Sequence, residues 1–209
     1  WGAREITTEK IFQFMPDNLP AHAEIWRDRE NNHYIADDRD NPLAKDRRYY
    51  GIQGQLWSEN TRSDTLAEYK IYPRLFALAE RAWHKADWAL PYNYNGELYS
   101  KDTHFFDQKR QEQRDKQWQL FAHTIGQKLL PKLEQQGVFY RLPFAGAKII
   151  NGLLHANSSF PHVTIEYQHN NEPWRKYTQP VKVLGQVKVR TRAFNGERRS
   201  KILSVKMDY

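Results

Sequence analysis

The sequence has 209 residues, enough for one large domain or two small ones, and it contains no cysteine. The missing cysteines exclude disulfides, cysteine-ligated zinc and a thiol nucleophile, while 39% hydrophobic and 14% aromatic residues argue against wholesale disorder. The charge is divided, because residues 1–100 hold 13 basic and 16 acidic side chains whereas residues 101–209 hold 19 basic and 9 acidic ones. A uniformly basic nucleic-acid-binding protein would not show this division. No stretch approaches the roughly 18 apolar residues of a membrane span.

Residues 1–50 are polar and irregular, and a short strand is predicted directly after them at residues 52–57. The strand is bounded by Gly51 and contains Gly54. A glycine inside a strand commonly marks the close approach of another part of the chain or of a ligand.

A helix is predicted after Pro73, a residue that suits the first helical turn. Its apolar positions recur at helical spacing and form one apolar stripe, made of Tyr72, Leu75, Phe76, Ala79 and Trp83.

A second helix is predicted to begin with Asp102 or Thr103 as its cap and to stop at Gly137. Pro131 is expected to kink or interrupt it, because proline lacks the backbone N–H that a helix interior needs. The stripe of this helix comprises Trp118, Phe121, Ala122, Ile125, Leu129 and Leu133.

After Gly137 the hydrophobic pattern changes to a period of two, and turn residues such as Asn195-Gly196 separate the apolar runs. Several short strands at this spacing predict a small all-β sandwich, with a domain boundary near residues 136–145. The predicted strands are 139–142, 148–153, 163–167, 181–184, 187–194 and 199–205.

If Asn195-Gly196 forms a two-residue hairpin turn, Arg192 lies opposite Arg199 and Arg190 lies opposite Lys201. Like charges that face each other destabilise a sheet, so this stripe needs an explanation. It is either a face that binds an anion or, as we favour, a solvated face whose long side chains fan into water. The stripe comprises Lys188, Arg190, Arg192, Arg199 and Lys201.

Trp57 and Glu59 would share one face at the end of the predicted strand at residues 52–57. An indole beside a carboxylate suits sugar recognition, because the ring covers the apolar face of a pyranose and the carboxylate accepts hydrogen bonds from hydroxyls. The alternative is a core tryptophan beside a glutamate that caps a helix. In a β/α barrel the end of such a strand would lie at the active-site face.

Three parts of the sequence resemble glycoside hydrolase family 20, and within it the bacterial chitobiases, which are β-N-acetylhexosaminidases. The segment GIQGQLWSENTRSD followed by YPRLFALAERAWH resembles their last barrel strand and last helix. The opening WGAREITTEKIFQFMPDNLPAHAE resembles the segment after the seventh barrel strand. The runs FYRLPFAGAKI, VTIEYQHNNEPWRKY and QVKVRTRAFNGERRS are similar to their immunoglobulin-like C-terminal domain.

The resemblance implies an α+β chain, in which the closing strand and helix of an incomplete (β/α)8 barrel precede an immunoglobulin-like β-sandwich. The implied domains are the barrel section at 1–100, a linking helical segment at 101–137 and the β domain at 138–209. A complete barrel needs about 250 residues. We therefore expect a C-terminal piece of a longer enzyme, although a mature protein could also begin at Trp1 without Met or a signal sequence.

The resemblance also assigns roles: Trp57 lines the −1 subsite, Glu59 holds hydroxyls of the non-reducing N-acetylglucosamine, and Trp1 forms another aromatic wall. In this family the substrate's own acetamido oxygen attacks the anomeric carbon, and an adjacent Asp-Glu pair assists. The sequence contains no Asp-Glu dipeptide. We therefore expect no catalytic residue in it and no hydrolysis by this chain alone.

The partners implied are chitobiose or a similar N-acetylglucosamine oligosaccharide and the upstream remainder of the barrel, without a metal, an organic cofactor or nucleic acid. The parent enzyme is expected to be exported, either periplasmic or associated with the outer membrane. The competing interpretation is a non-catalytic structural or carbohydrate-binding module. A nucleic-acid binder is disfavoured, because the sequence has no matching motif.

Overall fold

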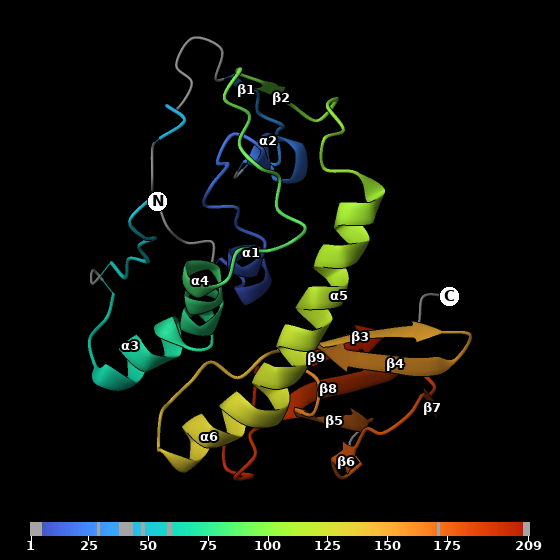
Figure 1. The fold of residues 1–209 in the computed structure, drawn as a ribbon. Helices are drawn as coiled ribbons and strands as arrows, with labels where there is room; N and C mark the ends of the chain where they lie inside the picture. The colour runs from blue at the N-terminus through green and yellow to red at the C-terminus, as the bar shows by residue number, and fades with distance from the viewer. Residues whose placement is uncertain are drawn as a thin grey trace. The chain divides into compact units, whose positions relative to one another are not determined.

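A computed structural model describes residues 6–28, 30–37, 44–46, 49–57, 60–170 and 172–206 (Figure 1). The chain divides into two compact units. The first unit comprises Trp1–Leu56 and Arg74–Gln119, and the second comprises Trp57–Pro73 and Leu120–Tyr209. The domain boundaries expected from the sequence stay predictions. None of the helices in the described ranges is long and apolar enough to span a bilayer.

The first unit is held together by aromatic side chains that come from distant parts of the sequence. The Phe12 ring lies 6.1 Å from that of Trp88 and 5.4 Å from that of Trp118, measured between ring centroids. Trp88 is fully buried. The elements of this unit are α1 Thr8–Phe12, α2 His22–Ile25, α4 Arg74–Trp83, most of α5 Gln108–Thr124, and the antiparallel pair β1 Ala36–Asp37 and β2 Leu98–Tyr99.

Helix α4 begins directly after Pro73, as predicted, but two large members of its apolar stripe are exposed. Leu75 is 40% exposed and Trp83 is 91% exposed, whereas Ala77 and Arg81 are buried. The physical reason is that α1 packs against α4 and the Arg81 guanidinium lies over the Phe12 ring. Leu75 and Trp83 therefore lie on a side of α4 that is exposed to solvent, although both belong to the apolar stripe.

The predicted strand at residues 52–57 is also wrong, because residues 51–57 form neither strand nor helix. A strand exists through pairing with a neighbour, and no described segment pairs with this one. The expected close approach at Gly54 is nevertheless present, because a Cβ at this position would lie 2.6 Å from Leu78 Cδ2. The glycine makes room for a side chain of α4.

Helix α5 begins at Gln108, and its cap is Asp107 instead of the predicted Asp102 or Thr103, because the Arg110 N–H donates to Asp107 Oδ1 at 2.8 Å. The interruption predicted near Pro131 is confirmed, because a π-helical turn, η1 Ile125–Leu129, separates α5 from α6 Leu130–Gln135. The stop at Gly137 is confirmed as well. Its φ is +72°, and the Val138 N–H donates to the Leu133 carbonyl at 3.0 Å.

The strands of the second unit form two antiparallel sheets around one hydrophobic core (Figure 1). The three-stranded sheet has the order β3 Ala145–Ile150, β4 Leu153–Ser158 and β7 Val181–Lys182. The four-stranded sheet has the order β6 Arg175–Lys176, β5 Thr164–His169, β8 Gln186–Arg192 and β9 Leu203–Lys206. The core comprises Ala145, Leu154, Tyr167, Val183, Val187 and Val189, so both sheets contribute to it.

Five of the six predicted strands overlap observed ones, with shifted bounds, whereas residues 139–142 are not a strand. β4 and β6 were not predicted as strands of their own. A tight turn at Asn151 and Gly152, with φ of +50° and +74°, ends β3 earlier than predicted and starts β4.

Another helix, α3 Asp64–Ile71, begins where Ser63 Oγ accepts a hydrogen bond from the Leu66 N–H. The mixed α and β composition is confirmed, while the barrel and the immunoglobulin-like topology stay predictions.

Candidate functional site

The predicted sugar-binding residues are not assembled in the described part of the chain. Trp57 is 68% exposed, at the end of the irregular residues 51–57. Glu59 and Trp1 lie outside the described residues. The roles assigned to these three side chains therefore stay predictions.

The basic stripe on β8 and the following residues surrounds a buried carboxylate. Glu166 on β5 is 7% exposed, and its oxygens lie 2.9 Å from Arg190 Nε, 3.3 Å from Arg192 Nε and 3.7 Å from Arg199 Nε. The Arg190 guanidinium also stacks on the Trp174 ring at 3.7 Å. The facing arginines are thus tolerated because they share one anion, a feature that the sequence pattern did not reveal.

The register of this hairpin agrees with the prediction near the turn and departs from it further on. Arg192 lies opposite Arg199, as predicted. Further from the turn, β8 and β9 pair Val189 with Leu203, a register shifted by one residue, so the pairing of Arg190 with Lys201 stays a prediction. The extra residue between the two pairings is a β-bulge, which a turn motif alone does not predict.

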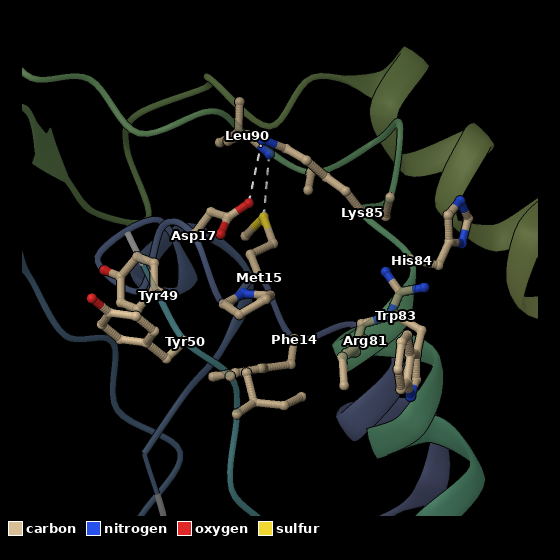
Figure 2. Close-up of a pocket in the computed structure, with 16 residues that line it drawn as sticks. Phe14, Met15, Asp17, Tyr49, Tyr50, Arg81, Trp83, His84, Lys85 and Leu90 are labelled. Atoms are coloured by element: carbon tan, nitrogen blue, oxygen red, sulfur yellow. Dashed lines mark hydrogen bonds and ion pairs between the residues drawn. The ribbon is translucent and has the colours of Figure 1, made fainter. Parts of the chain in front are cut away.

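The first unit contains a cavity of about 300 Å³ (Figure 2). Four segments line it: residues 14–17 after α1, residues 49–52, residues 81–86 at and after the end of α4, and residues 89–90. Figure 2 draws Tyr49 and Tyr50 on one side of the view and Arg81 with Trp83 on the other. The cavity therefore combines aromatic rings with a cationic side chain.

Arg81 is the buried charge of this cavity, with 5% of its surface exposed. Its guanidinium lies over the rings of Phe12 and Trp88, at 4.7 and 5.4 Å from their centroids. Nη2 donates to Glu80 Oε1 at 3.3 Å, while Nε has no partner among the described residues. Burial lowers the pKa of Arg81, and the neighbouring Glu80 carboxylate opposes that shift.

The other charges near the cavity are paired with one another. Lys85 Nζ lies 3.3 Å from Asp17 Oδ2, and Glu80 Oε1 lies 2.7 Å from His84 Nδ1 as well as near Arg81. One Glu80 oxygen therefore contacts both Arg81 and His84, and the Asp17 carboxylate forms an ion pair with Lys85. No group of three or more His, Asp or Glu side chains in the described ranges is placed to hold a metal ion.

A buried histidine supports the wall formed by Phe14 and Met15. His22 Nε2 accepts from the Met15 N–H at 2.9 Å, and His22 Nδ1 lies 2.8 Å from the Leu19 carbonyl. A neutral ring with its proton on Nδ1 satisfies both bonds. Burial lowers the pKa of His22, with Lys10 adding to the shift and the Leu19 carbonyl opposing it.

No motif in the sequence points to Arg81 as a site residue. Its contacts with Phe12 and Trp88 come from other segments, so no local motif announces them. The available signal was its spacing, because Arg81 lies four residues after Ala77 on the face of α4 that turns out to be buried.

Two family descriptions match this chain in succession. Residues 6–86 match the family described as "Glycosyl hydrolase family 20, catalytic domain", and residues 129–202 match the "Chitobiase/beta-hexosaminidase C-terminal domain". The two matches fall on the parts of the sequence that carry the resemblance described above.

Three curated relatives agree with these matches. The chain is 38% identical to an N,N'-diacetylchitobiase from Vibrio harveyi over 99% of its own length and 23% of that relative. It is 37% identical to a beta-hexosaminidase from Vibrio vulnificus, over 94% of its length and 23% of the relative. It is 54% identical to beta-hexosaminidase B from Pseudoalteromonas piscicida, over 60% of its own length and 16% of that relative. The chain therefore spans less than a quarter of the length of each of these relatives.

Proposed function

The chain belongs to glycoside hydrolase family 20, and from this we propose that it forms the C-terminal part of a β-N-acetylhexosaminidase of the chitobiase type. The parent enzyme would remove terminal non-reducing N-acetylglucosamine from chitobiose and short chitin oligomers. The observation that carries the proposal is the order of the two family matches, catalytic section first, together with similarity to a chitobiase along 99% of the chain.

The proposed chemistry is retaining hydrolysis in which the substrate supplies the nucleophile, its own acetamido oxygen. In this scheme Trp57 covers the apolar face of the sugar in the −1 subsite, and Trp1 adds a second aromatic wall. Glu59 accepts hydrogen bonds from sugar hydroxyls. The catalytic Asp-Glu pair of the parent lies outside this sequence, which contains no such dipeptide.

The apolar side chains exposed in the first unit support a larger parent. Leu75 and Trp83 on α4 are accessible to solvent, as is Leu56. Exposed apolar patches commonly mark surfaces that another part of a protein covers. We propose that the upstream remainder of the barrel packs against them, and that residues 52–57 become its closing strand.

The same proposal includes an immunoglobulin-like fold for the β domain. It also includes export of the parent to the periplasm or outer membrane, where chitin fragments would be degraded. Fractionation of cells that express the parent gene tests the location. Recovery of the enzyme with cytoplasmic markers alone would contradict export.

The activity proposal is tested with a chromogenic N-acetylglucosaminide. We expect no turnover by the 209-residue chain and turnover by a polypeptide extended with the in-frame sequence that precedes Trp1 in the gene. In the extended polypeptide, Glu59→Gln should lower kcat/KM about 10- to 100-fold, because a hydrogen bond to a charged group contributes about 1.5–3 kcal/mol. Turnover by the 209-residue chain, free of longer enzyme, would contradict the expected inactivity.

Calorimetry separates this proposal from a module that merely binds carbohydrate. Chitobiose should bind the extended polypeptide, and Trp57→Ala should weaken that binding. Leu184→Ala is the control, because Leu184 is an exposed apolar residue that is none of the three proposed sugar contacts. Binding without any hydrolysis by the extended polypeptide would instead favour the non-catalytic carbohydrate-binding alternative.

A further inference from the structure

One segment of the match to the catalytic domain belongs to the second compact unit. That match covers residues 6–86, yet residues 57–73 group with residues 120–209 and not with the rest of the match. Trp57 is the first residue of this segment, and Glu59 lies two positions later in the sequence. The proposed sugar contacts are therefore followed directly by chain that packs with the β domain.

Helix α3 is the regular element of this segment, and it buries none of its own residues. It has eight residues, Asp64–Ile71, and none of them is buried. A helix of this length is marginal in water without tertiary contacts. The position of α3 therefore depends on the groups that it contacts elsewhere in the second unit.

Three contacts connect α3 and its C-terminal end to the chain that enters the β domain. The Glu68 carboxylate accepts a hydrogen bond from the Phe139 N–H, with 2.7 Å between Oε2 and the nitrogen. The Tyr72 carbonyl accepts from the Arg141 N–H at 3.0 Å. The Arg141 guanidinium lies over the Tyr69 ring, 5.6 Å from its centroid. We call these three contacts the α3 anchor.

The residues that receive the α3 anchor are themselves held by the β domain. Arg198, from the chain between β8 and β9, lies over the rings of Phe139 and Tyr140, 4.5 Å from each centroid. Its Nη1 donates to the Tyr140 carbonyl at 2.9 Å, and its Nη2 lies 3.1 Å from Glu134 Oε2. The anchor therefore connects α3 to residues that several contacts fix in place.

At its other side α3 holds the residues that follow the proposed sugar contacts. The Lys70 ammonium donates to Thr61 Oγ1 at 2.9 Å, and Ser63 Oγ caps the helix. Thr61 lies two positions after Glu59 in the sequence. A continuous set of hydrogen bonds therefore leads from the β domain through α3 to chain that is two residues from Glu59.

We propose that the β domain positions the sugar-binding segment of the parent enzyme and that Glu68 is a positioning residue for Glu59. This inference rests on the proposed function, because the role of Glu59 at the sugar comes from there. Glu68 does not touch the sugar in this scheme. It holds α3 against Phe139, and α3 determines where the chain before it can lie. A misplacement of about 1 Å can cost a reaction about 100-fold, so such support matters to the rate.

Hydrogen exchange in the 209-residue chain tests the α3 anchor without any substrate. Glu68→Ala removes the acceptor of the Phe139 N–H, so this amide and the peptides of residues 60–72 should exchange faster, with little change in β5. Glu172→Ala is the matched control, since Glu172 is a carboxylate of the same unit that pairs with Arg175. Unchanged exchange over residues 60–72 in Glu68→Ala would overturn the inference.

A double-mutant cycle in the extended polypeptide tests whether Glu68 acts through Glu59. Glu68→Ala should lower kcat/KM for a chromogenic N-acetylglucosaminide about tenfold. Glu68→Gln keeps an oxygen acceptor and should stay within about twofold of the natural sequence. In the Glu59→Gln background, Glu68→Ala should cost only about twofold, because the group that it positions is already impaired. Glu172→Ala should leave kcat/KM unchanged in both backgrounds.

The kinetic outcomes separate a failure of this inference from a failure of the proposed function. An equal loss from Glu68→Ala in both backgrounds would show an effect on stability alone and would overturn the positioning role. Full activity of Glu68→Ala in an otherwise active enzyme would overturn it as well. Absence of turnover by the extended polypeptide with the natural sequence would instead contradict the proposed function, and the inference would fall with it.

Discussion

The two units of this chain bury their cores in different ways. The second unit pairs strands that are close in sequence, such as β3 with β4, and places apolar residues of both sheets in one core. The first unit connects distant segments: β1 pairs with β2, and Glu24 accepts hydrogen bonds from the N–H groups of Phe105 and Phe106. Backbone ladders hold the second unit, whereas aromatic rings and side-chain hydrogen bonds hold the first.

This difference shows where the stability of each unit should be most vulnerable. A sheet distributes its stabilisation over many backbone hydrogen bonds, so one changed side chain removes a small share. A small helical unit around a few rings depends heavily on each of them.

The largest effect is expected from Trp88→Ala in the first unit. Trp88 is fully buried and contacts Phe12, Phe106 and Arg81, so its truncation leaves a large cavity. Loss of a buried tryptophan typically costs about 3–5 kcal/mol. Hydrogen exchange followed by mass spectrometry should show faster exchange in peptides of α1 and α4, with little change in β5 and β8. Faster exchange throughout both units would show that the two unfold together.

The second unit should be most sensitive at Gly126, where η1 approaches the turn around Pro161. A Cβ at residue 126 would lie 1.8 Å from the Pro161 carbonyl oxygen, which is backbone and cannot rotate away. Gly126→Ala should therefore destabilise the second unit by about 1–3 kcal/mol, measured by urea denaturation. Gly51→Ala is the control, because a Cβ there meets nothing within 4 Å. Equal midpoints for both variants would contradict the close packing.

Sequence reasoning succeeded where the signal was local. The stop at Gly137, the interruption near Pro131 and the facing pair Arg192 and Arg199 each depend on residues a few positions apart. Such features arise from backbone preferences that hold in any surroundings.

The same reasoning failed where a distant segment decides the outcome. Apolar spacing on α4 could not reveal that Ala77 and Arg81 face α1, because the ring of Phe12 comes from another segment. The residues 52–57 have a strand-like pattern, yet a strand needs a partner that the described residues do not offer. The cationic cavity was missed for the same reason, and Glu166 beneath the basic stripe also belongs to a different strand.

A smaller effect is expected when the shared carboxylate of the basic stripe is neutralised. Glu166→Gln keeps the size of the side chain but leaves Arg190, Arg192 and Arg199 without their common anion. We expect a loss of about 1–2 kcal/mol, reduced from the value of a buried pair because the arginines reach water. Added salt should recover part of this loss by screening the arginines, and an equal loss at all salt concentrations would contradict the electrostatic cause.

The smallest effect concerns pH and returns to the first unit. The pKa of His22 is lowered mainly by burial, so below pH of about 6.5 the unfolded chain takes up a proton that the folded unit does not. The stabilisation from neutral His22 is complete above that pH. It is lost as pH falls toward the lowered pKa, by at most about 1.4 kcal/mol per pH unit. Denaturation at pH 7.5 and 5.5, compared with His22→Gln, should show a steeper pH dependence in the natural sequence. The difference should appear at first-unit probes, because His22 accepts from the Met15 N–H and thereby fixes the wall beside the cavity. Equal pH dependence in the two proteins would show that the folded unit accommodates a charged His22.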